Sequence, residues 1–251
     1  MWRRAAAEAL GTFFLVLIGP GASAVHAYTG GAVTHVGVAL AFAFVICAMV
    51  VAIGHLSGAH INPAVTVAFW SVRRFAGKDV IPYVAAQCVG ATAAAAVLRA
   101  VLGNAGRLGA TVPTVSPGSA LVVEWLLSFA LMFVIMAVAT DPRATRDGGG
   151  IPPIAIGLTV GFCALTGGPL TGASMNPARS LGPALLSGTW TAHWVYWLGP
   201  LTGMLAGARV YEVLRPIYRS QSTPRGLSLG LDGPIDGAGA EAPTDQTAVC
   251  P

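Results

Sequence analysis

The chain has 251 residues, of which 55% are hydrophobic and 10% charged, with a formal net charge of +4. Soluble domains carry about 25% charged residues, and a core formed by a chain of this length could not bury so much apolar sequence. The composition therefore excludes an ordinary soluble protein and predicts an integral membrane protein.

Six apolar runs follow one another along the chain, each close to the ~20 residues that a helix needs to cross ~30 Å of hydrocarbon. They cover residues 5–27, 34–55, 79–103, 118–140, 151–168 and 191–214. The first run is long enough to remain as a span, so we expect no cleavable signal peptide. Trp190, Trp194 and Trp197 at the start of the sixth run are typical of side chains anchored at a membrane interface.

Basic residues gather in alternate connections between the runs. Arg3 and Arg4 precede the first run, and Arg73, Arg74 and Lys78 lie between the second and third. Arg143 and Arg146 lie between the fourth and fifth, and Arg215, Arg219 and Arg225 follow the sixth. The opposite connections hold Arg107, and Arg99 lies near a helix end. This bias predicts a multi-pass protein of the cell membrane with both termini in the cytoplasm.

The last residues, 216–251, are polar and rich in Gly and Pro, which predicts a disordered cytoplasmic tail. Lysine is scarce beside many arginines and alanines. That usage is typical of a GC-rich bacterial genome and favours a bacterial inner membrane.

The sequence before the tail repeats itself. "AEALGTFFLVL" from Ala7 resembles "VEWLLSFALMF" from Val123, and each carries one glutamate, Glu8 or Glu124, at the head of an apolar run. Each half holds three spans, so the second half enters the membrane in the opposite orientation. We therefore expect one channel domain over 1–215, made of inverted repeats at about 1–103 and 118–215, with its site where the halves meet.

Two short stretches share the tripeptide Asn-Pro-Ala: "GAHINPAVT" at 58–66 and "GASMNPARS" at 172–180. Asn favours a helix N-cap and Pro the first helical position, so each stretch predicts a helix start. The apolar residues that follow are too few to span, since about nine residues cover ~13 Å. The non-helical residues before each start are tolerated at membrane depth only beside protein or water, which indicates a wet path.

Two Asn-Pro-Ala half-helices, six spans and an arginine after the second motif resemble the aquaporin (major intrinsic protein) family, over roughly 1–215. The resemblance implies an all-α membrane protein with six transmembrane helices and two re-entrant half-helices, a single-file pore and a homotetramer in the lipid bilayer. The implied pore motifs are Asn62, Pro63, Ala64, Asn176, Pro177 and Ala178. The implied pore-lining backbone belongs to Gly58, Ala59, His60, Gly172, Ser174 and Met175.

The chemistry of the two asparagines suggests how ions and protons are excluded. An N-cap Asn uses its side-chain oxygen on backbone N–H groups, which leaves its NH₂ free to donate to water in the lumen. Each helix start carries about +0.5 charge, so a monovalent cation ~5 Å from both, at an effective dielectric constant of ~20, is disfavoured by ~3 kcal/mol. Desolvation of the ion adds to this barrier. The alternative is that Asn62 and Asn176 are structural caps alone.

The resemblance also identifies an outer selectivity filter of Phe42, Ala164, Ala173 and Arg179. Strict water channels usually carry His where this chain has Ala164, so we expect a wider constriction. Glycerol facilitators usually carry an acidic and a basic residue where this chain has Ser180 and Ala184. We expect passage of water and of small neutral solutes such as glycerol, urea, ammonia or undissociated metalloid acids.

Several residues have a structural alternative to a functional role. Arg179 could donate to loop carbonyls, and Glu8 and Glu124 could accept hydrogen bonds from the re-entrant backbone instead of carrying protons. His60 is expected to shape its loop. Gly199, Gly203 and Gly207 predict close helix packing.

The remaining residue patterns limit the function classes. Cys47, Cys88, Cys163 and Cys250 show no metal or disulfide spacing, and Cys163 is expected to serve packing. The sequence has no hydrolytic triad, phosphate loop or metal cluster, so we expect no enzyme, cofactor, metal or nucleic-acid partner. The alternatives to a channel are a proton-coupled transporter and a non-conducting structural membrane protein.

Overall fold

The computed structural model describes residues 1–141 and 151–215, and within these ranges the chain is α-helical with no β-strand. The predicted tail, together with Arg143 and Arg146, lies outside the described residues. Six long helices correspond to the six predicted spans: α1 (Trp2–Tyr28), α2 (Thr34–Ser57), α4 (Gly77–Leu102), α5 (Pro117–Thr140), α7 (Ile151–Thr171) and α9 (Val195–Leu214). Two short helices, α3 (Pro63–Ser71) and α8 (Pro177–Ser187), begin at the Asn-Pro-Ala motifs.

The structure corrects the bounds and the apolar character of the later spans. Helix α7 continues to Thr171, and α9 begins only at Val195 because the residues before it form turns. Five of the six long helices are both long and apolar enough to cross a membrane, and α9 is the exception. Its 20 residues still suffice for ~30 Å, but Arg209 and Glu212 lower its hydropathy.

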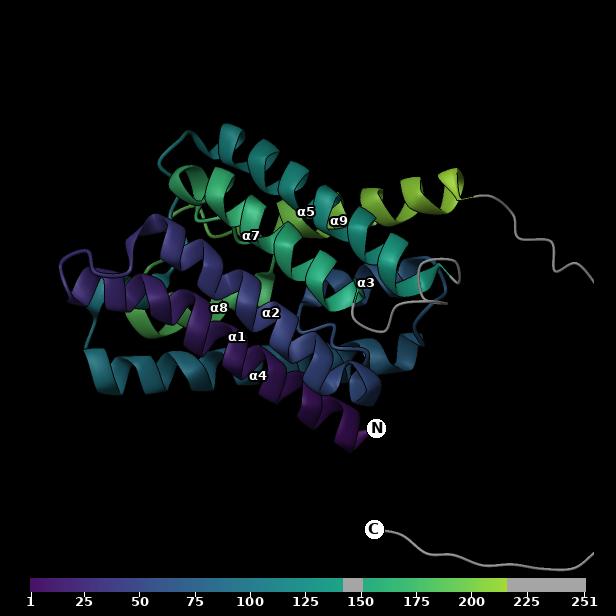
Figure 1. Ribbon diagram of the computed structural model, residues 1–251, viewed down its shortest axis with the longest axis horizontal. Coiled ribbons are helices and arrows are strands. Elements are labelled where there is room, and N and C mark those ends of the chain that lie inside the picture. The colour runs from purple at the N-terminus through teal and green to yellow at the C-terminus, as the bar shows by residue number, and fades with distance from the viewer. Residues whose placement is uncertain (142–150, 216–251) are drawn as a thin grey trace, which may run out of the picture. The chain divides into compact units, whose positions relative to one another are not determined.

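The helices form two halves, α1–α4 and α5–α9, and the short helix of each half packs mainly against a long helix of the other half. Helix α1 packs against α4 and α5 packs against α9, while α2 and α7 meet across the halves. The short helix α3 packs mainly against α9, and α8 packs mainly against α4. In Figure 1 helices α1, α2 and α4, coloured purple to blue-teal, lie to one side of α5, α7 and α9, coloured teal to yellow-green. Each half therefore completes the other.

Glycines allow the backbones of paired helices to touch. A Cβ at Gly203 of α9 would collide with the carbonyl oxygen of Trp125 on α5, and one at Gly207 would lie 2.6 Å from the carbonyl oxygen of Phe129. On the other pair, a Cβ at Gly90 of α4 would collide with the carbonyl oxygen of Ala9. The predicted small-residue stripe is thus a close helix contact.

The largest buried apolar cluster surrounds the centre of the molecule. It includes Phe42, Ile46, Leu131, Ile135 and Val160. The same five side chains line a central cavity, so the hydrophobic core and the wall of the cavity are one structure.

Candidate functional site: a pore between two re-entrant segments

Each re-entrant segment starts with a left-handed glycine at the end of a long helix. Gly58 (φ +91°) follows α2 and Gly172 (φ +86°) follows α7. The residues that follow alternate in sign of φ, with positive values at Ala59 and Ile61 in one half. In the other half the positive values fall at Ala173 and Met175. Such residues each cost about 1–2 kcal/mol, so the surrounding structure must hold both segments in place.

The two buried glutamates hold these segments. Glu8 accepts hydrogen bonds from the backbone N–H groups of His60 (2.9 Å) and Ile61 (2.6 Å). In the other half, Glu124 accepts from the backbone N–H groups of Ser174 (2.8 Å) and Met175 (2.9 Å). Both glutamates are fully buried, and neither lines the central cavity. Their contacts are those of structural acceptors.

We call Glu8 with its hydrogen-bond partners the first brace, and Glu124 with its partners the second brace. Side chains on neighbouring helices complete the two braces in the same way. Ser57 donates its hydroxyl to Glu8 (2.7 Å), and Thr171 donates its hydroxyl to Glu124 (2.7 Å). Tyr83 on α4 donates to the carbonyl oxygen of Ser57 (2.8 Å), and Tyr196 on α9 donates to that of Thr171 (2.7 Å). The inverted repeat therefore extends to individual hydrogen bonds.

The two asparagines cap the short helices, as the sequence predicts. The side-chain oxygen of Asn62 accepts from the N–H of Ala64 (2.9 Å). That of Asn176 accepts from the N–H groups of Ala178 (3.1 Å) and Arg179 (3.2 Å). The prolines of both motifs occupy the first helical position. Prolines and alanines of the motifs lie outside the cavity lining, so they shape the helix starts from behind the wall.

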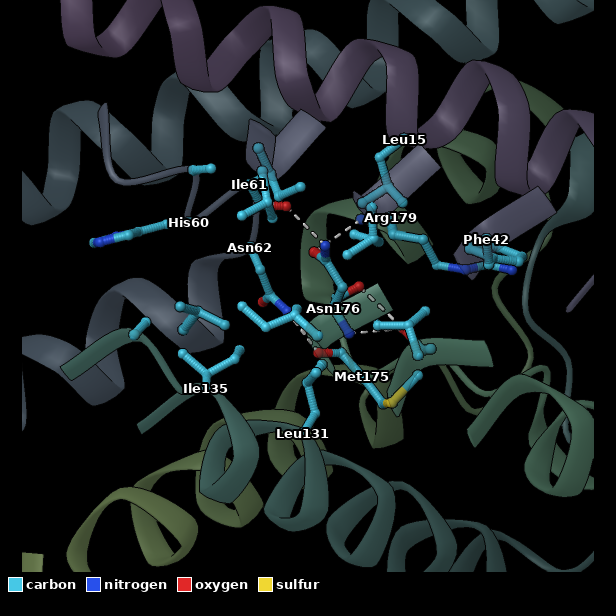
Figure 2. A pocket seen from close by; sticks show the side chains of 18 of the residues that line it. Leu15, Phe42, His60, Ile61, Asn62, Leu131, Ile135, Met175, Asn176 and Arg179 are labelled. Atoms are coloured by element: carbon cyan, nitrogen blue, oxygen red, sulfur yellow. Dashed lines mark hydrogen bonds between the residues drawn. The ribbon is translucent and has the colours of Figure 1, made fainter. Parts of the chain in front are cut away.

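The asparagine NH₂ groups are only partly free, which corrects the expectation from the sequence. Asn62 Nδ2 donates to the carbonyl oxygen of Met175 (2.8 Å), and Asn176 Nδ2 donates to that of Ile61 (2.9 Å). Figure 2 shows both bonds crossing between the halves at the middle of the cavity. One N–H of each amide thus joins the two re-entrant segments. The second N–H of each has no acceptor among the described residues, and both side chains line the cavity.

The central cavity runs from the proposed filter past the asparagines to the opposite end of the molecule. It contains all four filter residues and most of the expected backbone positions: Phe42, Ala164, Ala173, Arg179, Gly58, Ala59, His60, Ser174 and Met175. Gly172 lies instead in a second cavity beyond the filter. Phe42, Ala164 and Arg179 line both cavities, which places them at the constriction between the two.

Arg179 both lines the cavity and donates a hydrogen bond to a loop carbonyl, so it combines the two roles considered from the sequence. Its Nη1 donates to the carbonyl oxygen of Gly109 (2.9 Å), and its guanidinium carbon lies 5.2 Å from the centroid of the Phe42 ring. In Figure 2 the two side chains lie next to each other at one end of the cavity. Its Nε is shielded from solvent and has no hydrogen-bond partner among the described residues.

Two glycines that the sequence did not single out shape this constriction. Gly109 ends the short turn η1 (Ala105–Gly109) with φ +70°, and a Cβ there would collide with the carbonyl oxygen of Pro20 on α1. A Cβ at Gly19 would collide with the ring of Phe42. These close contacts orient the Gly109 carbonyl oxygen towards Arg179 and fix the position of the Phe42 ring. They join residues that are far apart in the sequence, so no local sequence pattern predicts them.

The described residues contain no group of three or more His, Cys, Asp or Glu side chains that could hold a metal ion. The thiols at positions 47, 88 and 163 are free, and Cys163 is fully buried among apolar side chains. The central cavity is lined mainly by apolar side chains, and the amides of Asn62 and Asn176 and the guanidinium of Arg179 are among its few polar groups.

The sequence profile of the family described as "Major intrinsic protein" matches residues 1–211. The chain belongs to the major intrinsic protein family. Proteins of this family are channels, so the protein is a multi-pass membrane channel and not an enzyme.

The relatives of this major intrinsic protein include plant proteins. Aquaporin NIP1-1 of Oryza sativa subsp. japonica is 46% identical over 210 residues, which cover 83% of this chain and 73% of the relative. Nodulin-26 of Glycine max is 45% identical over 210 residues, covering 83% of this chain and 76% of the relative. These sources do not support the bacterial origin suggested by amino-acid usage.

A solved structure shares the fold. The aquaglyceroporin from Plasmodium falciparum superposes with a TM-score of 0.77 and 25% sequence identity, covering 85% of this chain and 96% of that one. The all-helical architecture, with two short helices between two halves, is therefore that of the aquaporin fold.

Proposed function

We propose that this protein is a passive channel that conducts water and small neutral solutes and excludes ions and protons. The observation that carries the proposal is the pair of amide donors at the centre of the cavity, each at the start of a half-helix that points its positive end inward. A water molecule there accepts hydrogen bonds through its oxygen and turns its hydrogens away, which interrupts a proton wire. A cation meets two positive helix ends and loses hydration.

The composition of the constriction supports the passage of solutes larger than water. Ala164 and Ala173 present only methyl groups to the cavity that the ring of Phe42 and the guanidinium of Arg179 also line. Small side chains leave room for a carbon backbone, while Arg179 offers a donor to a hydroxyl or carbonyl oxygen. We include glycerol, urea, ammonia and undissociated metalloid acids in the proposed solute class.

We extend the proposal to topology and assembly. Both termini face the cytoplasm, residues 1–215 form the channel domain, and residues 216–251 form a tail. Apolar side chains exposed on the long helices are suited to lipid or to other subunits of a homotetramer, and they include Phe44, Val51, Ile81, Val89, Val122 and Leu158.

The positions of Glu8 and Glu124 argue against a proton-coupled transporter. Each carboxylate is bonded to re-entrant N–H groups behind the cavity wall, and neither lines the cavity. A proton carrier would need to meet the transported solute, so these groups serve the backbone.

The substitution Ala164→His tests the proposed filter. An imidazole at this position narrows the constriction between the two cavities, so glycerol permeability should fall at least tenfold while water permeability falls less than threefold. The measurement is light scattering from proteoliposomes of matched protein content, challenged with water, glycerol and urea gradients. Ala155→His on the same helix is the control, because Ala155 lines neither cavity. A native protein that conducts no water refutes the function, and an unchanged ratio refutes the filter.

A further inference from the structure

Pro169 interrupts the hydrogen bonding of α7 close to the selectivity filter. Inside an α-helix the carbonyl oxygen of one residue accepts from the N–H four positions later. Pro169 stands four positions after Leu165 and has no N–H, so the carbonyl oxygen of Leu165 lacks its usual donor within α7. Leu165 directly follows the filter residue Ala164, which places the interruption beside the constriction.

The first half of the chain has no such interruption. Pro169 stands seven positions before Asn176. Seven positions before Asn62 the chain has His55, which keeps its backbone N–H. The missing bond is therefore a feature of the second half, and it departs from the symmetry that the two braces follow.

A histidine from the first half supplies the missing donor. His35, near the start of α2, has its Nε2 2.9 Å from the carbonyl oxygen of Leu165. A carbonyl oxygen can only accept, so Nε2 carries a hydrogen and donates it. Gly168 makes room for the ring, because a Cβ there would lie 2.8 Å from His35 Cε1. The bond joins α2 to α7 at the carbonyl that Pro169 leaves without a helical partner.

The bond from His35 lies where the direct contact between α2 and α7 weakens. Farther along the interface, a Cβ at Gly157 of α7 would lie 2.7 Å from the carbonyl oxygen of Ala43 on α2. A Cβ at Gly161, about one turn nearer to Leu165, would have its nearest neighbour, the Cβ of Ala43, at 3.0 Å. The helices are thus tightest at Gly157, and a side chain joins them at the other end.

Both ends of this bond are attached to the selectivity filter. Phe42 stands seven residues after His35, about two turns along the same face of α2. Ala164 is the neighbour of Leu165 in α7, and Phe42, Ala164 and His35 all line the second cavity. The separation of α2 and α7 at this level sets the separation of the Phe42 ring and the Ala164 methyl group, so a bond between the two helices limits the width of the constriction.

We propose that His35 is a positioning residue of the selectivity filter, which holds α7 against α2 through the carbonyl oxygen of Leu165. Both residues are exposed, so water can replace His35 at this carbonyl when the bond is absent. The channel then stays folded, but the two helix ends separate more often. One hydrogen bond of ordinary net strength changes such an equilibrium about fivefold. The proposal rests on the proposed channel function and names a residue that determines its selectivity.

The first test separates the hydrogen-bond donor of His35 from its bulk. Leucine fills a similar space without a donor, so His35→Leu should raise the glycerol-to-water and urea-to-water permeability ratios about twofold to fivefold, because a wider constriction favours the larger solute. Glutamine carries an NH₂ group that reaches about as far as Nε2, so His35→Gln should keep the native ratios. The measurement is light scattering from proteoliposomes of matched protein content. His55→Leu is the matched control, because His55 is exposed on α2 and lines neither cavity.

The outcomes distinguish the positioning role from the channel function. Unchanged ratios in His35→Leu, or equal shifts in His35→Leu and His35→Gln, overturn the positioning role. With native water and glycerol flux intact, either result leaves the channel function standing. A native protein that conducts neither water nor glycerol refutes the channel function instead.

The second test addresses the carbonyl through which His35 acts. Pro169→Ala restores a backbone N–H that competes with His35 for the carbonyl oxygen of Leu165, so the two substitutions share one acceptor and should be non-additive. In the Pro169→Ala background we expect His35→Leu to change the glycerol-to-water ratio by less than about 1.5-fold. The same fold-change in both backgrounds overturns the proposal. Should Pro169→Ala not assemble, the comparison of His35→Leu with His35→Gln decides.

Discussion

Glu124→Gln removes an acceptor from the centre of the second brace while it keeps the size of the side chain. One carboxylate oxygen of Glu124 accepts from the hydroxyl of Thr171 and the N–H of Ser174, and the other accepts from the N–H of Met175. Glutamine has a single acceptor oxygen, so its NH₂ must face a buried backbone N–H. One unsatisfied N–H and weaker remaining bonds together predict a loss of about 2–4 kcal/mol in the free energy of unfolding.

Reversible unfolding in mixed detergent micelles measures this loss. Glu212→Gln is the control, because Glu212 pairs with Arg74 (2.8 Å) and Arg215 (3.4 Å) at the partly exposed end of α9. Partly exposed ion pairs contribute at most about 1 kcal/mol, so this control should be close to native. Equal stability of the two variants would refute the bracing role. Uptake driven by a pH gradient in the native protein, abolished in Glu124→Gln, would instead establish a proton carrier.

Two further substitutions probe the centre and the filter. Asn62→Asp places a carboxylate opposite the carbonyl oxygen of Met175, now 2.8 Å from the amide nitrogen; we expect fewer assembled channels and a cation leak through those that form. Native water flux without a leak, measured with an ion-sensitive dye, would contradict the assignment of Asn62. Ala173→Cys puts a thiol in the cavity wall, so mercurials should block it strongly, whereas the native channel should respond weakly because none of its described cysteines lines the cavity. Strong block of the native channel that persists after replacement of those cysteines would overturn this prediction.

Much of the fold could be predicted from the sequence because its signals are local. The length of an apolar run predicts a membrane span, and Asn followed by Pro predicts a capped helix start, as both short helices show. The matching glutamates, Glu8 and Glu124, revealed the inverted repeat. Each of these inferences needs only neighbouring residues or a comparison of the chain with itself.

The parts that the sequence did not predict depend on contacts between distant residues. The bonds from Asn62 to Met175 and from Asn176 to Ile61 each join residues more than 110 positions apart. The carbonyl of Gly109 reaches Arg179 only because η1 packs on α1. No local pattern encodes such pairs, since they arise when helices from both halves pack together.

The crossed asparagine bonds make the two halves energetically dependent on each other. A change at Asn62 alters the partner of Met175, whose N–H is held by Glu124, so the disturbance reaches the second brace through one residue. Substitutions in the two motifs should therefore be non-additive, because they share a single connected network. The duplicated segments of the chain cannot diverge independently: a change of backbone position in one motif constrains what the other tolerates.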